Sequence, residues 1–392
     1  MMQPLPAGRT PPPLPVSRWL LATLLGIVMP RAARAEGSVS YKYQDYREAA
    51  GRIAVQVQSA LFDQDLGTAM HFSVTGVMDT IAGATPNGQP ERTPGAGVPV
   101  FHMEELRKAW SLDFSRQFSA VKLSAGLANS REGDYVSNGA SLNALVDFNT
   151  KNTTVLLGVA GTQDDVKVFY QKPHRDKRSF DVIAGITQLL DPLTTVTANL
   201  SYGEATGYLG DPYKVVEKIT EDFPGIFLRH TYAENRPEFR AKWIAFASVN
   251  RAFPGLHGAL EASGRLHRDD FGVRSTTLNL EWYQKIGAHL LVRPSLRLYR
   301  QEAADFYLVT LTGTSIVPPA RPSGRAPYYS ADYRLSALQT LNYGLKAIWT
   351  VTEAWQLDAA YERYEMRGLD GRTSPSAYPQ TAVATFGLKF TY

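Results

Sequence analysis

The sequence closes on TAVATFGLKFTY, residues 381–392, and this stretch decides the fold. Polar or small residues such as Thr385 and Lys389 occupy one set of alternating positions. Apolar side chains occupy the other set, which ends with Phe386, Leu388, Phe390 and Tyr392. Successive side chains of a β-strand point to opposite faces, so the stretch predicts a strand with one wholly apolar face.

A strand with an apolar outer face is typical of the closing strand of a bacterial outer-membrane β-barrel, where that face meets lipid. The alternation of residues 381–392, with its final aromatic, resembles the insertion signal of such barrels. We therefore expect outer-membrane lipid and the barrel assembly machinery as partners. The alternative is the edge strand of a soluble β-sandwich, which shows the same alternation with its apolar face packed inward.

The first 35 residues have the pattern of a cleaved signal peptide. Arg9 and Arg18 supply positive charge, and the apolar run from Trp19 to Met29 is too short to span a bilayer as a helix. Small residues at Ala33 and Ala35 suit a signal peptidase. We expect export, with residues 36–392 forming one barrel domain in the outer membrane of a Gram-negative bacterium.

Charge and cysteine content narrow the possible functions. The chain has 41 Lys and Arg against 37 Asp and Glu, but this excess comes from the leader, which carries four arginines (Arg9, Arg18, Arg31 and Arg34) and no acid. The remaining chain is balanced, which does not favour nucleic-acid binding. It has no cysteine, so no disulfide framework can stabilise it.

From residue 36 onward, alternating segments of about ten residues recur, and no apolar run reaches the ~18–20 residues of a membrane helix. The first predicted strand is Val39 to Tyr46, and the second sets Ile53, Val55 and Val57 against Gln56 and Gln58. We predict an all-β, transmembrane antiparallel barrel of about 16 strands, with 14 or 18 left open. Longer loops are expected at 81–103, 164–178, 204–236, 303–332 and 365–380.

Charged residues fall on one face of the predicted strands, for example Asp181, Lys242 and Glu281. The opposite face is almost free of charge except at strand ends such as Arg300 and Arg363. A lysine or arginine facing lipid at mid-depth costs ~2–4 kcal/mol, whereas a water-filled lumen accepts it. One-sided charge therefore favours a barrel in lipid.

Five charged residues on the predicted inner wall are expected to lie close together near the hairpin at Gly287. In the hairpin around Gly287, positions equidistant from the turn place Glu281 beside Arg293 on the inner wall. The full predicted cluster is Glu261, Arg265, Glu281, Arg293 and Arg297. It is either a charge ladder that stiffens the wall or a constriction that selects permeants. Because acids and bases nearly balance, no strong ion selectivity is expected.

The sequence contains no nucleotide-binding glycine loop and no His-Glu-x-x-His metal motif, and we expect no cofactor, no metal and no enzymatic activity. His71 and Ser73 share one face of a predicted strand, but no acid is predicted beside them. Asp63, Asp65 and Gly67 are interpreted as a hairpin turn, since a calcium loop would need a later bidentate Glu.

Four stretches in the first third are similar to a bacterial family, the domain of unknown function 3570. They are residues 43–48, 64–67, 77–86 and 107–110. The most distinctive stretch contains Asp79, Gly83, Thr85 and Pro86 and is expected to be a strand end running into a turn. The resemblance, expected over the whole chain after the leader, implies an outer-membrane barrel. It supplies no catalytic residues.

Family members are often encoded beside a small lipoprotein, a thioredoxin-like protein and a flavin transferase, so the resemblance also implies a partner in an envelope redox or metal-handling system. Three functions remain open from the sequence. The first is a passive channel or conduit for a small solute or an exported partner. The second is a scaffold with a blocked lumen for a lipoprotein or redox protein. The third is an outer-membrane enzyme, which we do not expect.

Overall fold

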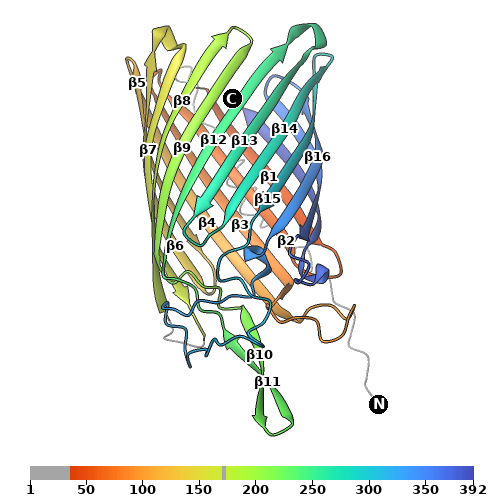
Figure 1. Ribbon diagram of the computed structural model, residues 1–392. Helices are drawn as coiled ribbons and strands as arrows, with labels where there is room; N and C mark the ends of the chain where they lie inside the picture. Colours follow the sequence, from red (N-terminus) through yellow and green to blue (C-terminus); the bar gives the residue numbers. More distant parts are fainter. Residues whose placement is uncertain (1–35, 170–173) are drawn as a thin grey trace.

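The computed structural model describes residues 36–169 and 174–392, so the predicted signal peptide lies outside the described residues. Sixteen antiparallel strands form a closed barrel (Figure 1). One end of the barrel carries short turns, and the other carries long loops. In the described part of the chain, no helix is both long and apolar enough to cross a membrane.

Eight strands run from the short-turn end to the long-loop end. They are β1 (Gly37–Glu48), β3 (Met70–Pro86), β5 (Val121–Arg131), β7 (Thr153–Lys167), β9 (Thr194–Gly207), β13 (Gly258–Asp269), β15 (Leu290–Gln301) and β17 (Trp355–Gly368). Eight strands return. They are β2 (Ala54–Leu66), β4 (Val100–Phe118), β6 (Tyr135–Phe148), β8 (His174–Asp191), β12 (Phe239–Phe253), β14 (Arg274–Ile286), β16 (Leu338–Thr350) and β18 (Gln380–Thr391).

The barrel closes between its first and last strands. Tyr43 of β1 lies opposite Phe386 of β18, and the backbone N–H of Tyr392 donates to the carbonyl of Gly37 at 2.9 Å. Closure leaves no sheet edge unpaired, as a lipid environment requires. The predicted antiparallel barrel of sixteen strands, including its first strand, is confirmed.

The outer face of the barrel is apolar over most of its height. Phe386 is 58% exposed, and Leu278 and Trp349 are similarly exposed on other strands. Trp355 and Phe390 pack side by side on the same face, with ring centroids 4.7 Å apart. This alternation of apolar outward and polar inward side chains is the pattern of an outer-membrane barrel.

The outer face departs from the predicted pattern on β2. Val55 lines the lumen, and Gln58 lies on the outer face because it pairs with Tyr43. On β1, Asp45 and Arg47 form an outward ion pair of 2.7 Å within the last four residues of the strand, which agrees with the expectation that outward charge is confined to strand ends such as Arg300. Alternation alone misassigned β2 because its two faces carry apolar and polar residues in similar number.

Several predicted loops are shorter than expected. β3 continues to Pro86 and β4 starts at Val100, so the loop predicted at 81–103 spans only 87–99. The loop predicted at 204–236 contains a separate hairpin of β10 (Val215–Phe223) and β11 (Ile226–Ala233), which projects beyond the other loops (Figure 1). Short 3₁₀ helices occur in turns and loops: η1 (Asn149–Lys151), η2 (Pro254–Leu256), η3 (Tyr333–Leu335) and η4 (Pro375–Ala377).

The hydrophobic core of the described chain lies at the long-loop end. Loops 87–99, 208–238, 302–337 and 369–379 pack together there, and we call them the loop cap. In one cluster, Phe306 of the cap meets Phe271 of the β13–β14 turn edge to face, and in another Tyr333 and Tyr378 do so within the cap. A third cluster joins Val216 of β10 to residues of the 302–337 loop, namely Leu311, Tyr329 and Ala331. The cap is therefore a packed unit built on the barrel rim.

Candidate functional site

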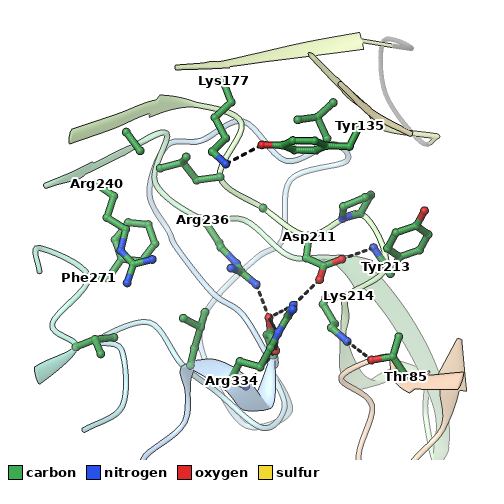
Figure 2. A pocket seen from close by; sticks show the side chains of 18 of the residues that line it. Thr85, Tyr135, Lys177, Asp211, Tyr213, Lys214, Arg236, Arg240, Phe271 and Arg334 are labelled. Carbon is green, nitrogen blue, oxygen red and sulfur yellow. Dashed lines mark hydrogen bonds and ion pairs between the residues drawn. The ribbon is translucent and has the colours of Figure 1, made fainter. Parts of the chain in front are cut away.

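A cavity of about 1180 Å³ lies between the loop cap and the barrel wall, and we call it the mouth cavity (Figure 2). The cap contributes residues such as Leu209 and Leu335, and the wall comes from strands on both sides of the barrel, from β1 to β4, from β6 to β9 and from β12 to β15. Four carboxylates line it: Glu132, Asp134, Asp211 and Asp332. Eight basic side chains line it: Lys177, Lys214, Arg236, Arg240, Lys242, Arg265, Arg297 and Arg334. Four more carboxylates, Asp164, Asp181, Asp269 and Glu234, pair directly with lining cations, so acids and bases around the cavity are equal in number.

Asp332 organises the part of the cap that borders the cavity. Its side chain is 1% exposed and accepts hydrogen bonds from Arg334 Nε at 2.9 Å and Arg236 Nη2 at 2.8 Å. Burial alone would raise the pKa of this carboxyl, but Arg334 and Arg236 hold the pKa of Asp332 well below its ordinary value. Arg334 also pairs with Asp211, so one arginine joins two loops (Figure 2).

Glu234 is a second buried acid in the cap. Its side chain has no exposed surface and pairs with Arg236 at 2.8 Å, and it accepts a hydrogen bond from Ser330 Oγ at 2.6 Å. Burial raises the pKa of Glu234 above its ordinary value. Glu234 and Asp332 thus share Arg236 but have pKa values displaced in opposite directions, which is characteristic of coupled buried acids.

Lys214 joins the cap to the barrel wall. It is 2% exposed, and its ammonium group donates to Thr85 Oγ1 at 3.2 Å and to the carbonyl of Pro86 at the end of β3 (Figure 2). Burial lowers the pKa of Lys214. Thr85 and Pro86 were selected from the sequence only by family resemblance, and the structure places them at this anchor point.

The other residues of the same stretch also contact neighbouring elements. Asp79 is 4% exposed and accepts a hydrogen bond from Arg107 Nε of β4 at 2.6 Å. Gly83 has φ of +130°, and a Cβ added there would lie 2.3 Å from the carbonyl oxygen of Arg52 in the β1–β2 turn. The stretch expected to run into a turn is instead wholly strand, because it pairs with β4 as far as Pro86, and its glycine permits the close approach to Arg52.

Most basic residues of the cavity wall have a carboxylate partner. Arg240 Nε lies 2.9 Å from Asp269 Oδ2, and the guanidinium stacks over Phe271. Lys242 lies 2.9 Å from Asp181, and Lys177 lies 3.3 Å from Asp164. Among the described residues, Arg265 and Arg297 have no carboxylate within ion-pair distance, and both are exposed within the lumen.

The structure brings together three members of the predicted lumen cluster on one stretch of wall. Arg293 Nη1 lies 3.0 Å from Glu281 Oε2, so the predicted contact is present. Glu261 lies directly opposite Glu281, and the Tyr283 hydroxyl lies 2.9 Å from Glu281 and 3.3 Å from Glu261. Arg265 and Arg297 line the mouth cavity instead, so the five residues do not form one contact network.

His71 differs from its prediction. Its Nδ1 lies 2.8 Å from Asp65 and its Nε2 lies 3.4 Å from Asp63, so the expectation that no acid lies beside it is wrong. Both aspartates belong to β2, on the other side of the tight turn at Gly67. No hydrogen bond joins His71 to Ser73 in the described chain, so a serine nucleophile activated by this histidine is not assembled. No group of three metal-ligating side chains occurs among the described residues either.

Comparisons with known proteins give the following matches. The chain is similar to the siderophore receptor PirA from Pseudomonas aeruginosa, at 12% identity and a TM-score of 0.44, covering 92% of this chain and 62% of that one. It thus spans about three fifths of that receptor. It is also similar to OprD from Pseudomonas aeruginosa, at 8% identity and a TM-score of 0.44, covering 92% and 95% of the two chains. OprB from Pseudomonas putida matches at 8% identity and a TM-score of 0.44, covering 91% and 92%.

No curated protein matches the sequence. The profile of the family described as "Protein of unknown function (DUF3570)" matches residues 89–382. Of the four stretches that carried the resemblance, only residues 107–110 lie inside this range. The expectation that the resemblance covers the whole chain after the leader is therefore too broad at both ends.

Proposed function

The chain belongs to the DUF3570 family, and we propose that it is an outer-membrane channel through which a small polar solute passes. The mouth cavity carries this proposal, because a polar, charged space of about 1180 Å³ suits a hydrated small solute. A barrel of sixteen strands is also large enough for an aqueous lumen. In this proposal the loop cap controls entry to the lumen.

Planar-bilayer recording tests the channel. We expect discrete open steps from the purified barrel, and more frequent opening in an Arg334→Gln variant, in which the cap loses its contacts to Asp332 and Asp211. Arg268→Gln, on the outer face of β13, is the matched control and should open like the unmodified protein. Electrical silence of both the unmodified protein and the Arg334→Gln variant would refute the channel.

A second candidate, a scaffold with a blocked lumen, is favoured by the packing of the cap. Tyr329 and Leu311 are completely buried there, so the loops over the mouth form a core of their own. The partner would be a small lipoprotein or a thioredoxin-like envelope protein. Stable co-purification of such a partner, together with electrical silence, would favour the scaffold over the channel.

The proposal includes no enzymatic step. His71 has two acidic neighbours, but it lacks a hydroxyl hydrogen-bonded to it in the described structure. Hydrolysis of lipid or peptide by the purified barrel, lost in a His71→Ala variant, would contradict this part of the proposal.

A further inference from the structure

The mouth cavity contains two cations that the protein itself does not neutralise. Of its eight basic side chains, five pair with a carboxylate. Lys214 is buried and hydrogen-bonded to Thr85 and Pro86. Arg265 and Arg297 remain, exposed to the lumen and without a carboxylate within ion-pair distance in the described chain.

The two arginines lie on one wall, separated by a single strand. Arg265 of β13 pairs with Thr277 of β14, and Arg297 of β15 pairs with Asn279 of the same strand. With strands ~4.8 Å apart and a rise of ~3.3 Å per residue, their Cα atoms are roughly 12 Å apart. Both side chains are long enough to reach a ligand held between them. Two such cations left unpaired repel each other, so an anion between them is stabilised by both.

The wall between the arginines offers neutral hydrogen-bonding groups. Thr277 faces the cavity between Arg265 and Tyr299, which lies opposite it on β15. Asn279, opposite Arg297, is hydrogen-bonded to Ser263 at 3.0 Å, whereas Gln301, one step further toward the loop cap, is already bonded to Tyr299 and to backbone carbonyls of the cap. A guanidinium is planar and binds carboxylate or phosphate oxygens through two parallel hydrogen bonds. Two of them with adjacent hydroxyls form a binding surface for a polyanion.

We propose that Arg265 and Arg297 form a binding site for a solute carrying two or more negative charges, of the phosphate or carboxylate class. The inference rests on the proposed channel function, since it names the class of solute that the lumen admits. It also departs from the expectation of no strong selectivity, because Arg265 and Arg297 have no carboxylate within ion-pair distance in the described chain although acids and bases are balanced overall. Deeper in the lumen, Glu261 and Glu281 add negative charge, so the site favours binding near the mouth.

Calorimetric titration of the detergent-purified full-length protein with inorganic pyrophosphate and, separately, with citrate tests the site. We expect saturable binding of at least one anion. Arg265→Gln and Arg297→Gln should each weaken that binding at least fivefold, and the double variant should weaken it further. Tighter binding of pyrophosphate would assign the phosphate class, and tighter binding of citrate would assign the carboxylate class.

Arg268→Gln is the matched control, because Arg268 is on the same strand as Arg265 but on the outer face. It should bind as the unmodified protein does. Absence of binding by either anion, or equal affinity of the double variant and the unmodified protein, would overturn the site. Binding by a protein that is silent in a bilayer would leave the site intact and refute the channel, so the two proposals fail separately.

Discussion

Arg293 and Glu281 form an ion pair of 3.0 Å across β14 and β15, although they are not directly opposite in the strand register. Glu281 lies opposite Ser295, and Arg293 lies opposite Lys346 on the next strand. The pair is thus a diagonal contact, which long side chains can make across a sheet. It neutralises one of the two carboxylates that face each other at Glu261 and Glu281.

We expect a measurable coupling between Arg293 and Glu281. Both side chains are a little over one quarter exposed, so a double-mutant cycle with Arg293→Gln and Glu281→Gln should give about 0.5–1 kcal/mol. Arg293→Gln alone should lower the free energy of unfolding more than Glu281→Gln alone, because it leaves the carboxylates of Glu261 and Glu281 facing each other without a cation. Urea unfolding from lipid vesicles measures both quantities. A coupling indistinguishable from zero would show that the pair contributes nothing.

Because β18 has one face toward lipid and one toward the lumen, a charge introduced on the two faces should affect stability differently. Phe386→Lys places an ammonium group in lipid and should cost ~2–4 kcal/mol if the site is near the bilayer midplane. Thr385→Lys places the same group on the lumen side of β18 and should be tolerated. Folding yield and unfolding free energy in vesicles compare the two variants. Equal damage from both would contradict the outward orientation of Phe386.

Substitution of Gly83 is expected to destabilise the barrel because of its backbone conformation and the carbonyl group beside it. Gly83→Ala brings a Cβ against the carbonyl of Arg52 at a φ that L-residues rarely adopt, and it should cost roughly 1–3 kcal/mol. Gly76→Ala, on the same strand with open space around its Cβ position, is the control. Thermal unfolding of the two variants should separate them. Similar stability would show that the turn carrying Arg52 can move away without cost.

Acid should loosen the loop cap only at low pH. The pKa of Asp332 is lowered in the folded protein by Arg334 and Arg236, so its stabilising contribution is complete above the unfolded value near pH 4. It is lost as pH falls through the lower folded pKa. The pKa of Glu234 is raised by burial, so its protonation opposes this loss. Hydrogen exchange across residues 302–337, corrected for intrinsic rates, should not become faster as pH falls from 8 to about 5, because only Glu234 takes up a proton in this range and its protonation stabilises the cap.

Asp332→Asn should expose the same loop at neutral pH, because Arg236 and Arg334 then lose their shared carboxylate. A cost of about 3 kcal/mol is expected, at the low end for a broken buried pair because half of the Arg334 side chain is exposed. Asp222→Asn, in the projecting hairpin, is the control and should leave exchange in 302–337 unchanged. Unchanged exchange in Asp332→Asn would show that the ion pairs do not hold the cap.

The barrel could be predicted from the sequence because its pattern is local. Lipid outside and water inside impose a period of two on every strand, as at Phe386 and Lys389, and closure follows from repeating it. The same pattern failed at β2, where the cap covers the lumen mouth and allows Val55 to face inward. The neighbours of His71 could have been found by pairing residues equidistant from Thr68, at the centre of the turn, which places Asp65 opposite His71.

The cap and the mouth cavity could not be predicted, because their contacts join distant segments. Arg334 and Asp211 are 123 positions apart, and Lys214 and Thr85 are 129 apart. Contacts between residues so far apart produce no repeating pattern in the sequence from which they could be predicted. The two unpaired arginines were also hidden, because the partners of the other basic residues, such as Asp269 and Asp181, are identified only once the strand register is known.

The projecting hairpin begins immediately after Lys214, and the backbone N–H of Val215 donates to the carbonyl of Asn87 at 2.8 Å. The base of the hairpin is therefore fixed to the residue that follows β3. Its far end carries exposed Phe223 and Phe227, at 63% and 65% of their surface. A partner that bound these rings would therefore contact a hairpin whose base adjoins Lys214, the residue that joins the loop cap to β3.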